Sequence, residues 1–510
     1  MDRPNILFAF ADDWGRYASI YRTVQGDQTP NAIVNTPNFD RIAREGALFT
    51  NAFVPAPSCT PCRSAVLSGR YFWQTERGAI LSGAVWDSSI PSYPLILEEH
   101  GYHIGFTYKA WSPGEPRDAP YGADRTRYAS AGADFNRFSH VVTERAAEIG
   151  IEAAKQERYD EVRKNFDSFL ENREAGKPFA YWWGPTNTHR TWERGSGKAL
   201  WGLEPDDLKG RLPGFLPDVH DVREDVADYL GECQAYDAGL GVLTQRLEEI
   251  GELDNTLIVV SGDHGIPGMP RGKCNLYDAG CEVALAARWP GHITPKRQVD
   301  DMVNIMDLAP TFLEAAGVKS PECMSARSLL DVLESPESGQ VDPDRTFVVT
   351  GRERHCKNAR EGNLPYPTRA IRTRDFLYIR NYAPDRWPAG DPKGLDDPRA
   401  EAPPFETLQW DTFVTYQDCD ASPTKAWMIH HRAEETLREI YELGFGKRPD
   451  EELYDLRSDP DHLRNLAGDP RMKVVKQQLA AQLLEVQNAH DDPRVCEDPC
   501  RFEHAPYAGD

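Results

Sequence analysis

The chain has 510 residues, 40% of them hydrophobic and 27% charged, which is the balance of an ordinary globular protein and excludes the disordered and fibrous classes. With 81 acidic and 58 basic residues, its net charge of −23 excludes recognition of nucleic acid or of an anionic membrane by bulk attraction. No apolar run reaches the roughly 18 residues that a membrane-spanning helix needs.

A chain of this length exceeds one compact core, so we expect a large domain and a smaller one. It opens without the basic start and long apolar region of a secretion signal. The sequence as given therefore predicts a cytoplasmic protein, or a periplasmic or secreted one if a signal was removed.

Ten cysteines are too few for a disulfide framework. We expect most to be reduced and buried, with Cys496 and Cys500 as a candidate pair.

Two short apolar runs end abruptly at side chains that can bind metals. They are residues 5–10, which lead into Asp12 and Asp13, and residues 256–260, which lead into Asp263 and His264. Each run is typical of a strand that is buried on both faces. Sites in open α/β sheets lie beyond the carboxyl ends of the strands, so the two runs predict an α/β fold with a largely parallel sheet. On their own, the acidic residues could equally cap a helix or form a surface turn.

Helical spacing follows between and after these runs. Residues 143–171 are rich in Ala, Glu, Lys and Arg, and residues 222–250 carry apolar side chains at helical intervals. The stretch 195–220 is rich in Gly, Pro and Asp and predicts a surface excursion.

The pattern changes near Pro365. Residues 369–382 predict a strand or hairpin, 383–404 are dense in Pro, Asp and Gly, and 472–489 predict a helix. We therefore expect a catalytic domain at 1–365 and a smaller α+β domain at 366–510.

Residues 58–70 read SCTPCRSAVLSGR. Cys59 and Cys62 form a Cys-x-x-Cys pair, which in other proteins is a redox dithiol or half of a zinc site. Neither a thioredoxin-like context nor a second ligand pair is visible. Two buried thiols at the start of a helix are a further alternative, because so short a pattern is weak evidence on its own.

The same residues resemble the signature Cys-x-Pro-x-Arg, followed by x-x-x-Leu-x-Gly, of the type I sulfatases of the alkaline phosphatase superfamily. Further segments resemble that family in the same order along the chain: 4–13, 35–46, 49–53, 259–265, 307–311, 452–456, 459–460 and 465–466. The resemblance implies an alkaline phosphatase-like domain, with a mostly parallel central sheet flanked by helices, and a smaller C-terminal domain with an antiparallel sheet.

In that family the signature cysteine, here Cys59, is converted to formylglycine by a formylglycine-generating enzyme during maturation. One oxygen of the hydrated aldehyde attacks sulfur, and the other then expels sulfate. The resemblance also implies one divalent metal at Asp12, Asp13, Asp263 and His264. Oxygen ligands suit Ca²⁺ first, with Mg²⁺ or Mn²⁺ as alternatives. Many relatives have asparagine at the position of His264, and this departure favours Mn²⁺ more than the family pattern does.

Four further residues match catalytic positions of the family. Arg63 would hold the formylglycine hydrate, Lys109 and Lys273 would contact the sulfate, and His189 would protonate the leaving group. Two residues after Lys109 the family usually has histidine, but this chain has Trp111. Without the motif, each lysine would be expected as a surface charge and the histidine as a structural residue.

Within the family, residues 268–277, the pair His189-Arg190 and residues 351–355 resemble heparan N-sulfatase and bacterial sulfatases that act on polysaccharides. On that basis Arg190, Arg354, His355 and Trp111 are candidate substrate contacts, whereas Glu282 stands where relatives usually have arginine. Residues 352–386 hold nine basic and four acidic side chains. This excess could steer a sulfated glycan or could be the charged face of a hairpin.

The sequence thus predicts a sulfatase that hydrolyses the sulfate of a small carbohydrate, as ester or N-sulfate, or of an aryl sulfate. A phosphodiesterase or phosphonate monoester hydrolase of the same superfamily is the alternative, and a non-catalytic carbohydrate-binding relic is the alternative from another class. We expect no nucleic-acid or membrane partner, and an oligomer is compatible with the sequence.

Overall fold

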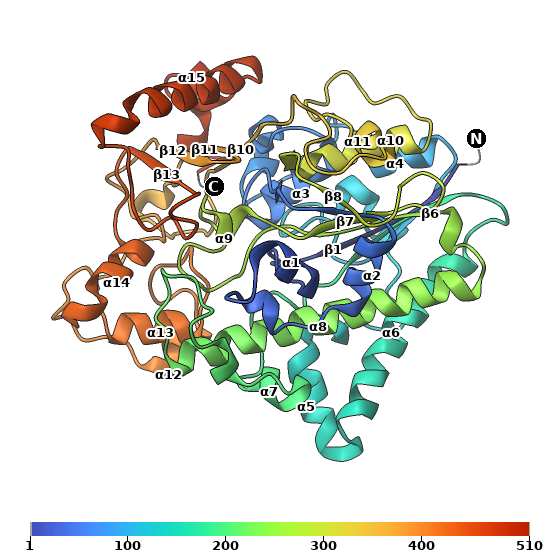
Figure 1. Cartoon of the computed structure of the whole chain (residues 1–510), viewed down its shortest axis with the longest axis horizontal. Helices are drawn as coiled ribbons and strands as arrows, with labels where there is room; N and C mark the ends of the chain where they lie inside the picture. Colours follow the sequence, from blue (N-terminus) through green and yellow to red (C-terminus); the bar gives the residue numbers. More distant parts are fainter. Residues whose placement is uncertain (1–2, 509–510) are drawn as a thin grey trace.

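The computed structural model describes residues 3–508. They form a seven-stranded and a four-stranded sheet side by side, with helices on both faces of the larger one (Figure 1), and a short two-stranded sheet of β3 and β9. The strands are β1 (Asn5–Ala11), β2 (Ala47–Phe49), β3 (Ala52–Phe53), β4 (His103–Tyr108), β5 (Phe179–Gly184), β6 (Thr256–Gly262), β7 (Leu285–Arg288), β8 (Arg297–Val299), β9 (Val303–Asn304), β10 (Phe347–Arg352), β11 (Thr368–Thr373), β12 (Phe376–Asn381) and β13 (Glu451–Asp455).

The α-helices are α1 (Arg22–Gln25), α2 (Pro37–Glu45), α3 (Cys59–Ser68), α4 (Tyr93–Glu99), α5 (Phe138–Ile149), α6 (Ile151–Glu171), α7 (Ser196–Trp201), α8 (His220–Glu249), α9 (Asp278–Cys281), α10 (Leu308–Ala315), α11 (Leu330–Glu334), α12 (Phe405–Trp410), α13 (Pro423–His430), α14 (Arg438–Phe445), α15 (Lys473–Ala489) and α16 (Pro493–Cys496).

The larger sheet has the strand order β4-β5-β1-β6-β7-β2-β8. Strands β4, β5, β1 and β6 are parallel neighbours, and β7 alone runs against the strands beside it. Parallel strands need crossover helices, which cover both faces of such a sheet. This confirms the predicted α/β class with a mostly parallel sheet.

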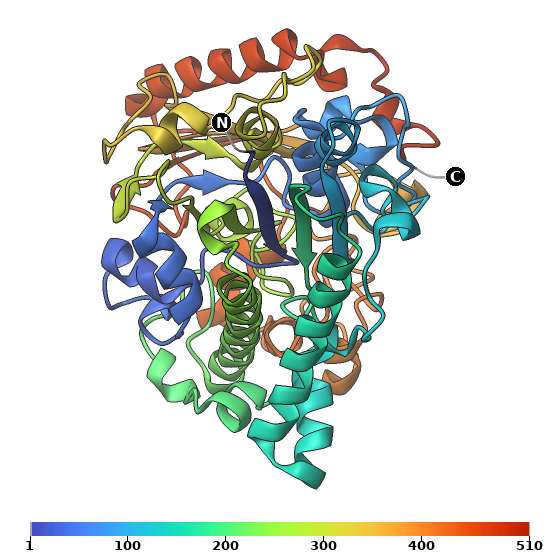
Figure 2. The same cartoon turned by 90° about the vertical axis from the view of Figure 1, so that its right-hand side faces the viewer.

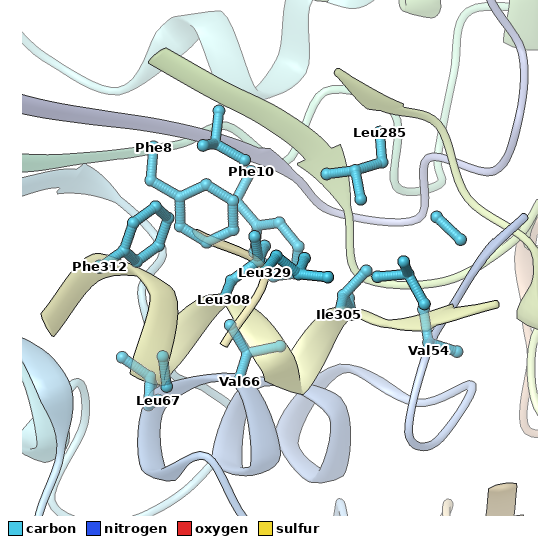
Figure 3. Packing of buried hydrophobic residues seen from close by; sticks show 14 of the residues in the cluster. Phe8, Phe10, Val54, Val66, Leu67, Leu285, Ile305, Leu308, Phe312 and Leu329 are labelled. Atoms are coloured by element: carbon cyan, nitrogen blue, oxygen red, sulfur yellow. The ribbon is translucent and has the colours of Figure 1, made fainter. Parts of the chain in front are cut away.

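Strand β1 is buried along its whole length because its side chains alternate between two cores. Phe8 and Phe10 face α3 and α10, where Phe8 lies 5.3 Å from Phe312 between ring centres (Figure 3). Leu7 and Ala9 face the other core, between the sheet and α8. The long axis of α8 runs beneath the sheet in Figure 1 and almost toward the viewer in Figure 2. Burial on both faces explains the unbroken apolar run in the sequence.

The predicted helix at 222–250 is confirmed as α8. The one predicted at 143–171 is two helices, because Gly150 adopts a φ of 85° between α5 and α6. That left-handed conformation breaks the helical ladder, and glycine adopts it without steric cost. The excursion at 195–220 contains the short helix α7.

The second sheet is antiparallel, in the order β10-β11-β12-β13. Helix α15 packs on it through Leu479 and Leu483. The first strand, β10, begins at Phe347, ahead of the boundary that we predict near Pro365, and the limits of the two domains stay a prediction. Between β12 and β13 a long connection carries α12, α13 and α14, which lie together below the second sheet in Figure 1.

Within residues 3–508, no helix is both long and apolar enough to cross a bilayer. All ten cysteines are free thiols in the described chain, Cys496 and Cys500 included, so that candidate disulfide is absent.

Candidate active site

The four parallel strands bring the predicted catalytic side chains to one edge of the sheet. Asp12 and Asp13 follow β1, Lys109 follows β4, His189 lies beyond β5, and Asp263 with His264 follows β6. The carboxyl ends of parallel neighbours share an edge, which is where α/β proteins place their sites.

Cys59 is the first residue of α3, and its side chain points at this edge. Its Sγ lies 3.4 Å from His264 Nε2 and 3.8 Å from Asp13 Oδ1. Burial, reinforced by the charge of Asp12, raises the pKa of the Cys59 thiol well above its usual value. An unmodified Cys59 is therefore a protonated thiol and a weak nucleophile.

Arg63, one turn along α3, joins the ends of β1 and β6. Its Nε donates to Asp263 Oδ2 at 2.8 Å and its Nη2 to Asp12 Oδ1 at 3.1 Å. The guanidinium has no exposed surface, and both carboxylates are buried with it. Buried charges need such partners, because each ion alone would lose its hydration without compensation. The arginine of the motif thus holds Cys59 in register with the two acidic strand ends.

Lys109 is the second cation at Asp12. Its Nζ donates to both carboxylate oxygens, at 2.6 and 2.8 Å. Burial alone would raise the pKa of Asp12, but Lys109 and Arg63 outweigh it and hold that pKa well below its ordinary value. Asp12 is therefore a carboxylate at neutral pH.

Asp13 has a positive φ of 56°, a conformation that aspartate tolerates better than most residues. Its Oδ2 lies 2.9 Å from Lys273 Nζ and its Oδ1 3.1 Å from His264 Nε2. The Tyr229 hydroxyl donates to its carbonyl at 2.9 Å. These contacts fix the turn that leaves β1.

Lys273 lies between three groups. Besides Asp13, its Nζ is 3.1 Å from His189 Nε2 and 3.3 Å from Asp420 Oδ2. Burial would lower the pKa of Lys273, but the carboxylates of Asp13 and Asp420 outweigh it and raise that pKa well above its usual value. The ring of His189 is oriented by the Arg190 carbonyl, 2.5 Å from Nδ1. If Nδ1 donates there, Nε2 is the atom that exchanges protons with the site.

The predicted metal ligands fit a divalent cation. Side-chain ligand atoms of Cys59, Asp263 and His264 lie within 4.8 Å of one another, as do those of Asp12, Asp13, Cys59 and His189. His264 Nε2 is also 3.5 Å from Asp263 Oδ1. The two groups share Cys59, and Asp13 Oδ1 connects them at 3.1 Å from His264 Nε2. Carboxylate and imidazole ligands at this spacing suit a divalent cation.

The four predicted substrate contacts are placed differently. His355 lies at the site, with Nδ1 2.8 Å from the hydroxyl of Ser58, the neighbour of Cys59. Arg354 is buried beside it, 2% exposed. Arg190 forms an ion pair with Asp225 at 2.8 Å. Their roles stay predictions.

Trp111, the fourth of these residues, has no exposed surface. Its indole N–H donates to Ser64 Oγ at 2.8 Å, and its ring meets Trp86 edge to face. The structure therefore gives this side chain a place in the core and no face toward a substrate.

The basic segment 352–386 is largely neutralised by ion pairs, most of them with acidic residues from elsewhere in the chain. The ion pairs are Arg352 and Arg360 with Asp418, Arg369 with Glu353 and Asp492, Arg372 with Asp278, Arg380 with Asp450 and Arg386 with Glu503. Side chains held in this way favour the structural interpretation over glycan steering.

Two contributors to the site are absent from the sequence predictions. Asp420 comes from the connection between β12 and β13, and Ser58 binds His355. The serine precedes the signature cysteine, but nothing in the sequence links it to position 355. No motif surrounds Asp420.

Known proteins resemble this chain along most of its length. The profile of the family described as Sulfatase matches residues 4–318, and that of "N-sulphoglucosamine sulphohydrolase, C-terminal" matches residues 270–388. N-sulphoglucosamine sulphohydrolase of Homo sapiens is 27% identical over 97% of this chain and 92% of its own length. An ulvan-active sulfatase of Formosa agariphila is 26% identical over 94% of this chain and 74% of its own length.

A solved structure described as a complex with its substrate, D-glucosamine-2-N,6-O-disulfate, has a TM-score of 0.61 at 19% identity, over 97% of this chain and 99% of that one. This likeness shows the alkaline phosphatase-like fold. Because the Sulfatase profile matches well over half of the chain, from the residue before β1 to the end of α10, the protein belongs to the sulfatase family and is a sulfuric ester hydrolase.

Proposed function

We propose that this sulfatase removes sulfate from a sulfated carbohydrate, as ester or N-sulfate, with formylglycine made from Cys59 as nucleophile and one divalent metal. One observation carries the proposal: Cys59 Sγ lies within 4 Å of both Asp13 and His264, at the strand edge where the acidic and basic side chains meet. The carbohydrate substrate is supported by the two relatives named above, which act on glucosamine N-sulfate and on ulvan by their names.

Formylglycine would supply a hydrated aldehyde whose two oxygens, in turn, attack sulfur and expel sulfate. A divalent cation held by Asp12, Asp13, Asp263 and His264 would supply positive charge at the sulfate oxygens. Ca²⁺ is our first choice, with Mg²⁺ or Mn²⁺ as alternatives.

The protein's own cations bind and orient the substrate. Lys109 contacts Asp12 and Lys273 contacts Asp13, so each acidic strand end has an ammonium group beside it. Fixed ammonium groups of this kind stabilise negative charge on a sulfate group better than water does, because they need no reorganisation during the reaction. Arg63 keeps position 59 in place through Asp12 and Asp263.

His189 is placed to move a proton. Its Nε2 is 3.1 Å from Lys273 Nζ, and a third of its side chain is exposed. It can therefore meet the bridging oxygen or nitrogen of a bound substrate and protonate it as the bond to sulfur breaks. The sugar then leaves as a neutral alcohol or amine.

The test begins with mass spectrometry of the intact Cys59 peptide, which should show an aldehyde or its hydrate in protein made with a formylglycine-generating enzyme. Desalted enzyme with added Ca²⁺ is then assayed on 4-nitrophenyl sulfate, glucosamine N-sulfate, glucosamine 6-sulfate and bis-4-nitrophenyl phosphate. Turnover of a sulfated sugar supports the proposal. Faster turnover of the phosphate diester than of every sulfate would replace it with the phosphodiesterase alternative.

A further inference from the structure

The connection between β12 and β13 inserts one loop into the active site. Residues 415–422 of this loop carry Asp420, whose Oδ2 is 3.3 Å from Lys273 Nζ. Asp420 thus contacts the same ammonium group, that of Lys273, as Asp13 and His189 do. It belongs to neither the Sulfatase profile, which ends at 318, nor the C-terminal profile, which ends at 388.

This loop is built rigidly. Lys425 is fully buried and donates to the carbonyls of Thr415 at 2.7 Å, Tyr416 at 3.2 Å and Cys419 at 2.7 Å. A buried ammonium group that donates to three carbonyls on one turn fixes the path of that turn.

The middle of the loop, at Asp418, and its end, at Ser422, are also tied to earlier parts of the chain. Asp418 accepts from Arg360 at 2.8 Å and from the Cys356 backbone N–H at 2.9 Å. Ser422 donates to the Gly268 carbonyl at 2.7 Å and caps α13 at Lys425 N–H. Asp420 is therefore held in one position relative to Lys273.

Asp420 differs from the other carboxylates of the site in its exposure. Its side chain is 17% exposed, against 2% for Asp12 and none for Asp13 or Asp263. Of these four side chains, that of Asp420 is the most exposed, although its Oδ2, which faces Lys273, is buried. The ring of His189, on the other side of Lys273 Nζ, is 34% exposed, so these two side chains border the open side of the site.

We propose that Asp420 determines substrate specificity by accepting a hydrogen bond from a hydroxyl or ammonium group adjacent to the sulfated position of the sugar. This inference rests on the proposed function. Lys273 contacts the sulfate in that function, so a group on the neighbouring atom comes within reach of the carboxylate beside it. A carboxylate can only accept hydrogen bonds and repels other anions. A neighbouring hydroxyl is therefore selected, and a second sulfate or a carboxylate at that place is rejected.

The competing explanation is that Asp420 only positions Lys273. Substrates that differ in the group next to the sulfate distinguish this positioning role from a direct contact with the sugar. Asp420→Asn and Asp420→Ala are compared with wild type on 4-nitrophenyl sulfate, which has no neighbouring donor, and on glucosamine monosulfates with matched disulfates whose second sulfate is on the neighbouring carbon. Asp385→Asn is the control, an exposed aspartate in the same connection. Asp420→Asn is nearly isosteric, so it keeps the test usable if the alanine variant folds poorly.

We expect wild type to prefer a monosulfate over its disulfated counterpart. In the Asp420 variants, kcat/KM on the preferred sugar should fall at least about tenfold more than on 4-nitrophenyl sulfate, mainly through KM, because a site built to bind a polar group discriminates strongly. In these variants the ratio of kcat/KM on the monosulfate to kcat/KM on the disulfate should become smaller than in wild type. Calorimetry with the inactive Cys59→Ala protein, alone and combined with Asp420→Ala, should show the same loss in binding of the sugar.

Equal losses on the aryl and sugar sulfates would make Asp420 a positioning residue for Lys273 and overturn the inference. Unchanged kinetics in both variants would do so too. The failure of the proposed function looks different, because it shows in the wild-type enzyme: wild type would cleave no sugar sulfate, or would cleave the phosphate diester faster than every sulfate.

Discussion

Asp263 accepts a hydrogen bond from the backbone N–H of Asp13 at 2.7 Å, which ties the end of β6 to the end of β1. Its other oxygen pairs with Arg63. One carboxylate therefore joins both acidic strand ends and the helix that carries Cys59, and the position of Cys59 depends on it.

Asp263→Asn should weaken metal binding, because it removes one negative charge and leaves one oxygen to serve two partners. We expect the metal concentration at half-saturation to rise at least about tenfold, as measured by calorimetry and by metal-dependent thermal shift. Asp254→Asn, at an exposed aspartate, is the control. An unchanged affinity would remove Asp263 from the ligand set.

Chelation by EDTA should lower activity and the melting temperature together. A cation present at 100 times its Kd stabilises the folded state by about 2.7 kcal/mol, and its removal takes that contribution away. Adding back Ca²⁺, Mg²⁺ and Mn²⁺ separately, with both readouts, ranks the three. An enzyme that is indifferent to strong chelators would have no metal in its mechanism.

Cys59→Ala should abolish hydrolysis and leave the fold intact, since a buried cysteine loses little more than its sulfur. Cys62→Ala, one position beyond Pro61 and equally buried, is the matched control and should retain turnover. The readouts are kcat/KM on the best sulfate substrate and the circular dichroism spectrum. Activity in the Cys59 variant would rule out the proposed nucleophile.

Arg63→Met should destabilise the protein by about 3–5 kcal/mol, because it leaves Asp12 and Asp263 buried without their shared partner. Urea denaturation measures the loss, and a saturating divalent cation should restore part of it. For comparison, Arg380→Met removes an exposed pair with Asp450 and should cost less than about 1 kcal/mol. Similar losses in the two variants would contradict the buried network.

The stability of the protein should fall in mild acid in part through His355. Burial lowers its pKa from 6.5 to about 3. Between these values the unfolded chain binds a proton that the folded protein does not, so the free energy of unfolding decreases as the pH drops from 6.5 toward 3. His355→Gln can keep a hydrogen bond to Ser58 but loses this titration.

The comparison is urea denaturation at about pH 7.5 and about pH 5, with His430→Gln, at an exposed histidine, as the control. The drop in unfolding free energy between these two conditions should be smaller in the His355 variant than in wild type. A drop of equal size in both would show that His355 does not contribute.

Most residues at the carboxyl edge of the parallel strands could be predicted, because a recognisable sequence pattern lies next to each of them. Apolar runs that stop at Asp12 and Asp263 mark buried strands, and the spacing from Cys59 to Arg63 puts both on one turn of α3. Lys109 and His189 each follow an apolar strand too. Parallel pairing then leaves little freedom in where these side chains meet.

The remainder depends on contacts between distant residues. Arg369 is neutralised by Asp492, 123 positions away, so the charge count over residues 352–386 could not show that this segment is paired. Trp111 stands two positions after Lys109 but turns into the core, where Ser64 accepts from it. Asp420 reaches Lys273 through a connection without regular pattern. None of these outcomes has a local signature.

Cys59 is 2% exposed and lies on the first turn of a helix that is buried along its length. An enzyme that oxidises Cys59 needs access to its thiol, and the folded chain covers that thiol. The oxidation that we propose therefore has to happen before α3 docks against β1. A molecule that folds before this oxidation would keep an unmodified thiol at position 59 and would be inactive.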